Sequence, residues 1–170
     1  MARMKKCPSC GGALVASKKR ETQSVAGREF VMTVTAGACR ACGSVFLENA
    51  SLQRAEMETA CELARHGPVS GDAFRYLRKT LGLRAVVVAD LLGVTPETIS
   101  RWENGQRPVD KAAWMTLGSV VLEQASRRPE TLERLRELRA HGPGARSVRI
   151  DATRELSSAT AKGLRVAAKR

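Results

Sequence analysis

The sequence contains few aromatic residues, few histidines and no long apolar run. Aromatic residues make up 4% of the 170 residues, and two histidines are present. A chain of this length supports one or two small domains rather than a large enzyme core. No stretch approaches the roughly 20 apolar residues that cross a bilayer, since residues 85–89 form only a short apolar run. We therefore expect a soluble protein that has no membrane partner.

The motifs of enzyme active sites and of exported proteins are missing as well. The sequence shows no Ser-His-Asp set, no paired carboxylates in a cleft-like setting and no phosphate-cradling glycine loop. Residues 1–6 lead directly into Cys7 without the apolar segment of an export signal. These absences predict a protein that is not an enzyme and that works in a reducing cytoplasm.

Negative charge is scarce relative to positive charge. The formal net charge is +12 and the pI is about 10.3, which favours a polyanionic partner through counterion release. Basic charge is densest in residues 146–170, which hold seven basic and two acidic residues. We expect this tail to be disordered until DNA is present.

Two Cys-x-x-Cys pairs stand out among the residues that are present. The first spans Cys7 to Cys10 and the second spans Cys39 to Cys42, and a glycine follows each pair. Two residues between the cysteines let both thiolates reach one ion from a tight turn. Four such thiolates form a closed tetrahedral site, with metal–sulfur distances of about 2.3 Å for zinc. The spacing therefore predicts that these four cysteines bind a structural zinc ion (Zn2+).

The segment between the pairs, residues 11–38, is somewhat longer than is common for such a site. It contains two predicted strands, Ala13 to Ser17 and Glu29 to Thr35, so a zinc-ribbon-like hairpin would bring the pairs together. Iron and a redox disulfide are the alternatives to zinc. A catalytic dithiol would need a pair at the start of a helix that follows a strand. Cys61 lies in a helical pattern without a partner, which indicates a buried or idle thiol.

Glycine–proline breaks divide the rest of the chain. They lie at residues 66–68 and 141–144 and end helices, because glycine relaxes the backbone and proline removes a donor. The breaks predict three parts, which are a zinc-binding ribbon domain with a C-terminal helix at residues 1–66, a helical domain at residues 67–145 and the basic tail at residues 146–170. Apolar periodicity predicts five helices in the middle part, at residues 70–81, 85–92, from 96 onward, 109–125 and 129–140. The fold class expected is α+β.

The helix that begins at residue 96 has the strongest local signals. Thr95 is a good N-cap, Pro96 suits the first helical position, and Glu97 lies in the first turn, where the helix dipole favours an anion. Ile99 and Trp102 are three residues apart and are expected to face inward. Such a helix, with its polar N-terminal half facing outward, suits insertion into the major groove of DNA.

These motifs resemble two known families. Residues 82–105 resemble the helix-turn-helix of the Cro/CI-type (Xre) family. Together with the two cysteine motifs, the chain resembles the MqsA (YgiT-type) zinc-finger antitoxins over about residues 5–138. The resemblance implies binding to operator DNA as a homodimer and neutralisation of a partner toxin.

The resemblance also implies which residues read bases. Thr98 and Arg101 fall at positions that touch base edges, and Arg101 would bond guanine O6 and N7. Glu97 occupies a third reading position, where a carboxylate accepts from the cytosine amino group. Glu103 is expected to form a buried ion pair with Arg78, which has a structural role.

Other positions match phosphate contacts. Asn104 falls where the family contacts the DNA backbone, and Arg107 and Lys111 would extend that contact. Arg84 stands in place of the usual cap at the start of the second helix and is expected to compensate as a phosphate contact. The valines at 86–88 replace a more polar pattern, so at least one extra valine should be exposed or covered by a partner.

Two functions remain open from the sequence alone. The first is an antitoxin that represses its own operon and whose zinc domain binds a toxin. The second is a stand-alone zinc-stabilised transcription factor without a toxin. Both make the same residue-level predictions about DNA, so the sequence does not separate them.

Overall fold

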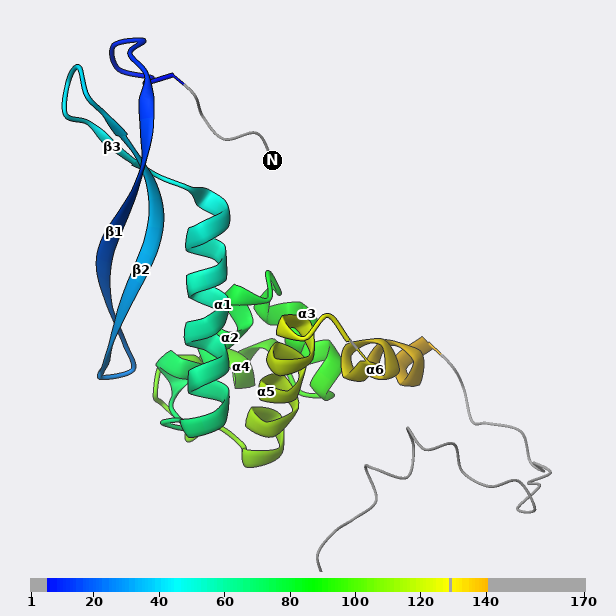
Figure 1. The fold of residues 1–170 in the computed structure, drawn as a ribbon. Coiled ribbons are helices and arrows are strands. Elements are labelled where there is room, and N and C mark those ends of the chain that lie inside the picture. Colours follow the sequence, from blue (N-terminus) through cyan, green and yellow to red (C-terminus); the bar gives the residue numbers. More distant parts are fainter. Residues whose placement is uncertain (1–5, 129, 141–170) are drawn as a thin grey trace, which may run out of the picture. The chain divides into compact units, whose positions relative to one another are not determined.

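The computed structural model describes residues 6–128 and 130–140. Within these residues, a three-stranded antiparallel sheet precedes six helices, which confirms the α+β fold class (Figure 1). The elements are β1 Leu14–Val25, β2 Arg28–Cys39, β3 Val45–Leu47, α1 Asn49–His66, α2 Gly71–Thr80, α3 Ala85–Leu92, α4 Pro96–Glu103, α5 Lys111–Ala125 and α6 Glu130–Ala140. The basic tail lies outside the described residues.

A long hairpin of β1 and β2 dominates the N-terminal part. The strands pair from Leu14↔Cys39 to Val25↔Arg28, and the two residues between them have φ values of 51° and 74°. Positive φ at both positions is the geometry of a type I′ turn, whose twist matches that of the strands. Each strand is longer than the sequence predicted, because cross-strand pairing also includes the polar residues 18–24, which carry no apolar signal.

Helix α1 packs along one face of the hairpin. The alternate β2 residues Met32, Val34 and Ala36 face it, and Val34 is fully buried. The Thr59 hydroxyl donates to the Met32 sulfur at 3.7 Å. The backbone N–H of Thr35 donates to the Ser51 hydroxyl at 2.9 Å. These contacts fix the hairpin beside α1, as Figure 1 shows.

The tip of the hairpin docks onto the helical core. Val25 belongs to the buried core cluster, and the Arg28 guanidinium donates to the Gly67 carbonyl at 2.8 Å and to Glu62 at 3.0 Å. The cysteine pairs lie at the opposite end of the strands. At about 3.3 Å per residue, the two ends of a 12-residue strand are separated by roughly 35 Å.

Helices α1 to α5 share one apolar core. Its buried members include Leu63 of α1, Phe74 and Leu77 of α2, Ile99 of α4 and Trp114 of α5. Helix α1 thus contributes to the same core as the helices that follow residue 67. The domain boundary expected after residue 66 stays a prediction.

Local signals set the helix boundaries accurately. Helix α3 has the predicted bounds, and Ser70 caps α2 by accepting from the Ala73 N–H at 3.3 Å. Helix α5 begins two residues later than predicted, because Asp110 caps it by accepting from the Ala113 N–H at 2.9 Å. None of the described helices is both long and apolar enough to span a membrane.

Candidate metal centre and nucleic-acid interface

The first cysteine pair forms a tight knuckle. The Gly11 N–H donates to the Cys7 carbonyl at 2.9 Å, and the Cys7 N–H donates to the Gly12 carbonyl at 2.7 Å. Gly11 has φ of +73°, a conformation that costs a residue with a side chain about 1 kcal/mol or more. The turn therefore depends on glycine directly after the second cysteine.

The second cysteine pair repeats this geometry. The Gly43 N–H donates to the Cys39 carbonyl at 3.0 Å, and the Cys39 N–H donates to the Ser44 carbonyl at 2.9 Å. Gly43 also has φ of +73°. Two matching knuckles thus face each other where β1 and β2 bring residues 14 and 39 into register.

The four sulfur atoms of the knuckles converge. The Sγ atoms of Cys7 and Cys42 are 3.6 Å apart, those of Cys10 and Cys39 are 3.5 Å apart, and all four lie within 4.8 Å of one another. A tetrahedron with metal–sulfur bonds of about 2.3 Å has edges of about 3.8 Å. The donor set and its spacing therefore fit a four-thiolate metal site.

The protonation of the exposed thiols differs. The Ser44 hydroxyl and N–H lower the pKa of Cys42 to about 6. The Gly12 N–H lowers the pKa of Cys10, but hydrogen bonds with the other three thiols outweigh it and raise that pKa to about 12. Because the pKa of Cys10 lies above neutral pH, a metal that binds this thiol as thiolate at neutral pH must displace its proton.

Gly12 has a role that the sequence analysis did not assign. A Cβ atom at this position would lie 3.1 Å from the Ala41 Cβ and 3.3 Å from the sulfurs of Cys10 and Cys39. A side chain would therefore press on two of the four sulfurs. In the sequence, the second glycine of the Cys-Gly-Gly motif could have indicated this steric requirement.

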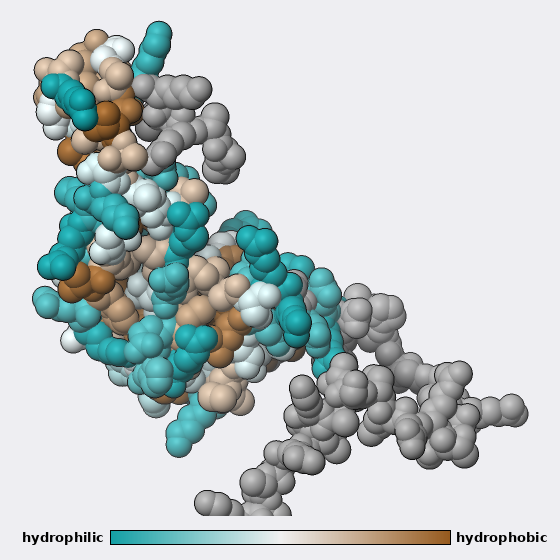
Figure 2. Space-filling model, viewed as in Figure 1, coloured by the Kyte–Doolittle hydropathy of each residue, from teal (hydrophilic) through white to brown (hydrophobic). Residues whose placement is uncertain are grey.

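In Figure 2, tan and brown residues gather at this end of the hairpin.

Helix α4 presents a polar face above a buried apolar one. The Thr95 hydroxyl caps the helix by accepting from the Thr98 N–H at 3.2 Å, as predicted. Ile99 is fully buried, and Trp102 packs edge-on against Phe74 with ring centroids 5.7 Å apart. The opposite face of the helix is open to solvent, including Glu97 and Arg101.

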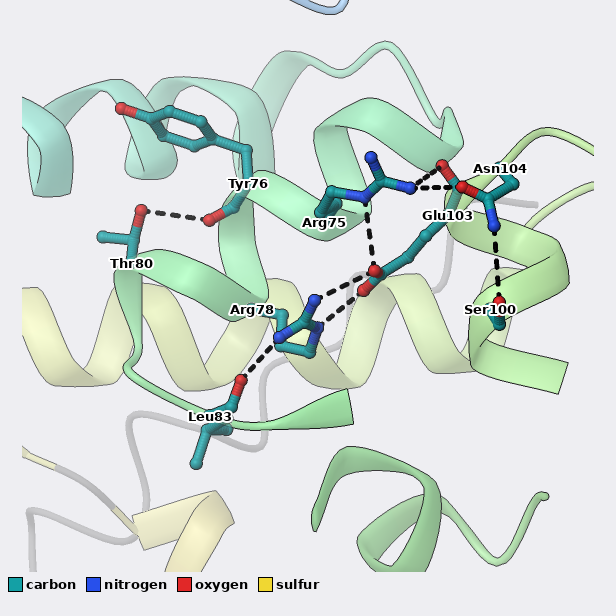
Figure 3. Close-up of polar contacts among 8 residues, drawn as sticks. All are labelled: Arg75, Tyr76, Arg78, Thr80, Leu83, Ser100, Glu103 and Asn104. Atoms are coloured by element: carbon teal, nitrogen blue, oxygen red, sulfur yellow. Dashed lines mark hydrogen bonds and ion pairs between the residues drawn. The ribbon is translucent and has the colours of Figure 1, made fainter. Parts of the chain in front are cut away.

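A buried ion pair anchors the C-terminal end of α4. Arg78 donates from Nε to Oε1 of Glu103 at 2.6 Å and from Nη2 to Oε2 at 2.9 Å. Its Nη1 donates to the Leu83 carbonyl at 2.8 Å, so one guanidinium joins α2, α4 and the turn before α3 (Figure 3). The predicted pair of Glu103 with Arg78 is confirmed.

Comparison with known protein families matches these features to one family. Residues 4–136 match the family described as the antitoxin component of a bacterial toxin-antitoxin system, MqsA. The chain belongs to the MqsA antitoxin family. No curated protein matches it significantly. Membership implies that this MqsA-family antitoxin has a cognate toxin as partner.

The structure places the predicted base-reading residues of this antitoxin on one surface. Arg101 and Glu97 are exposed, whereas Thr98 is half-buried and its hydroxyl lies 3.1 Å from that of Thr95. Thr98 and Arg107 line one hollow of about 590 Å³. The Arg101 carbonyl accepts from the Arg107 N–H at 3.2 Å, which holds the following loop against the helix.

Three of the predicted phosphate contacts lie at the ends of helices. Arg84 is the N-cap residue of α3, but its side chain makes no cap hydrogen bond and is exposed. Lys111 is exposed at the start of α5, and Asn104 is exposed at the end of α4. Val86 is 49% exposed whereas Val88 is buried, so the valine-rich start of α3 does expose an apolar side chain.

Two further residues hold the end of α4, and the sequence analysis missed both. Arg75 donates to the Glu103 backbone and side chain and to Asn104. Gly71 approaches the α4 backbone so closely that a Cβ atom would overlap the Trp102 carbonyl oxygen. Their partners lie about 30 residues away in sequence, so periodicity gave no sign of them, although Arg75 stands one helical turn before Arg78.

Proposed function

We propose that this MqsA-family antitoxin is a sequence-specific DNA-binding regulator that represses its own operon. The observation that carries the proposal is the geometry of helix α4. Its N-terminus is capped by Thr95, its polar face is exposed, and its opposite face is buried through Ile99 and Trp102. A helix fixed in this way offers Thr98 and Arg101 to base edges without further ordering of the backbone. Arg101 has the planar fork that bonds guanine at two atoms.

Exposed cations and an amide around α4 supply the accompanying backbone contacts in this proposal. Arg84, Asn104 and Lys111 stand at the starts and ends of α3, α4 and α5, and Arg107 lies in the loop between α4 and α5. Phosphate contacts of this kind fix register on DNA, while base contacts set the sequence preference. Two copies of the chain would bind two half-sites as a homodimer, about one helical turn apart or a multiple of it.

The metal of the knuckles is zinc in this proposal. Four thiolates suit zinc and fill its tetrahedral shell, so the ion would hold the two knuckles together and leave no position for a reacting water. The proposed role is therefore structural, and the protein acts without catalysis of its own. Four thiols gathered as ligands are consistent with a reducing cytoplasm.

The alternative is a stand-alone transcription factor with the same DNA-binding helix. The family match favours the antitoxin, because the family is defined by its place in a toxin-antitoxin system. Purification of the tagged chain from cells that express its full locus separates the two. Recovery of a small protein encoded by the neighbouring reading frame supports the antitoxin, and recovery of the chain alone supports the stand-alone regulator.

DNA reading by α4 is tested with one substitution. Arg101→Ala should weaken binding to a duplex from the promoter region of the chain's own gene by about 1 to 3 kcal/mol, with the loss confined to one base position. Fluorescence anisotropy against a set of single-base variants of the duplex measures this. Lys111→Ala is the matched control, because loss of a phosphate contact weakens binding to all sequences alike. Unchanged affinity and sequence preference for Arg101→Ala would refute the proposed role of α4.

A further inference from the structure

Arg75 forms three hydrogen bonds that converge on the C-terminal end of α4 (Figure 3). Its Nη2 donates to the Glu103 backbone carbonyl at 2.9 Å and to Oδ1 of Asn104 at 2.6 Å. Its Nε donates to Oε2 of Glu103 at 3.3 Å. The same guanidinium therefore binds the end of the helix and the side chain of the next residue.

The contact with Arg75 fixes which way the Asn104 carboxamide points. A guanidinium only donates hydrogen bonds, and a carboxamide has one accepting oxygen and one donating nitrogen. The oxygen of Asn104 must therefore face Arg75, because the reverse orientation would set donors against donors. The nitrogen, Nδ2, then donates to the Ser100 hydroxyl at 3.3 Å and carries a second N–H. Since Asn104 is exposed, this second N–H is available to a ligand.

We propose that Arg75 is a positioning residue that presents the Asn104 amide nitrogen to a DNA backbone phosphate. This inference rests on the proposed DNA-binding function. A phosphate oxygen only accepts hydrogen bonds, so the orientation held by Arg75 is attractive and the reversed orientation places oxygen against oxygen. Arg75 acts on DNA binding through Asn104, and its bond to the Glu103 carbonyl holds the guanidinium in place at the residue where α4 ends.

Arg75 and Arg78 have different tasks although both bind Glu103. Arg78 is largely buried and donates hydrogen bonds to both carboxylate oxygens of Glu103. The Arg75 side chain is 36% exposed and makes a longer contact with one of those oxygens. Removal of Arg75 therefore leaves the Glu103 carboxylate paired, so we expect Arg75→Ala to fold. This makes the positioning role separable from folding.

A double-mutant cycle on DNA binding tests the proposal. Arg75→Ala, Asn104→Ala and the double variant are compared by fluorescence anisotropy on the promoter-region duplex, with Arg54→Ala as a charge-matched control on the exposed surface of α1. Each single variant should bind on the order of tenfold more weakly, as expected for one hydrogen bond to a charged group. The double variant should bind no more weakly than Asn104→Ala, because Arg75 acts through Asn104. Losses that multiply would overturn the proposal.

A second measurement needs no DNA. In the unmodified chain, the two side-chain N–H signals of Asn104 in a 15N-resolved NMR spectrum should be widely separated, because the amide is held at both ends. Arg75→Ala should bring them to the positions of a free amide, while Arg54→Ala leaves them unchanged. Unchanged Asn104 signals in Arg75→Ala would overturn the positioning role. Failure of the unmodified chain to bind any promoter duplex refutes the proposed function instead, and the NMR result still decides the orientation.

Discussion

The two ends of the β1–β2 hairpin are stabilised by different chemistry. At the tip, Val25 enters the apolar core, and Arg28 bonds to Gly67 and Glu62. At the other end, two buried cysteines and two exposed ones converge on one point. In the described part of the chain, the core cluster reaches the hairpin at residues 25, 26 and 30, and not at the knuckles. The tip therefore depends on packing, whereas we expect the knuckles to depend on the metal ion that the four thiolates would hold.

From this contrast, we expect that the tip and the knuckles of the hairpin can be perturbed separately. Apolar burial stabilises in proportion to the area removed from water, and the helical core holds most of the buried apolar side chains. A small end that holds a metal would gain its order from ligand bonds, so we expect metal binding and local folding to be coupled there. Loss of the metal should loosen the knuckles and leave the helices folded.

Removal of one metal ligand should have the largest effect. Cys39→Ser should abolish metal binding, whose contribution to a four-ligand zinc site is on the order of 10 kcal/mol. Native mass spectrometry should show one metal ion per chain before the change and none after it, while circular dichroism retains the helical signal. Cys61→Ala is the matched control. Cys61 is buried in the helical core, so this variant should keep the metal bound. Loss of the helical signal in Cys39→Ser would contradict the separation of the two ends.

A cavity in the helical core should lower the stability of the helices and leave metal binding intact, which is the opposite of the effect of removing a metal ligand. Phe74 is fully buried and packs on Trp102, so Phe74→Ala should lower the free energy of unfolding by about 3 to 5 kcal/mol. Chemical denaturation measures this loss, and the metal content of the folded chain should stay at one ion. Met115→Ala is the control, because Met115 is 64% exposed. If Phe74→Ala released the metal from chains that remain folded, the two ends would be coupled.

The smallest effect concerns the charge pairs at the tip. The Arg28 guanidinium, followed by His66, lowers the pKa of the exposed Glu62 carboxyl below its ordinary value of 4.5. A lowered carboxyl pKa contributes stability that is present above the ordinary pKa and is lost as pH falls through the lowered one. The difference in melting temperature between the unmodified chain and Glu62→Gln should therefore shrink below about pH 4. A difference that stays constant from neutral to acidic pH would show that the pair does not support the tip.

Sequence signals predicted features that depend on neighbours in the chain. Thr95 and Pro96 marked the start of α4 because capping and the fixed proline φ act within one helical turn. The glycine after each cysteine pair marked the knuckles for the same reason. The full length of the hairpin was not predicted, because residues 18–24 are polar and pair only with a partner strand that lies elsewhere in the sequence.

By itself, the sequence determined the elements whose causes are local: the capped helix α4, the two cysteine turns, the glycine-ended helices and the excess of positive charge. The tertiary structure alone decided that α1 joins the helical core, that Gly71 must lack a side chain, and that Arg75 holds Asn104. Such contacts join segments that are separated in the sequence, and the Arg75–Asn104 contact spans 29 residues. Their energy depends on distances that only the folded backbone sets, so no pattern along the chain reports them.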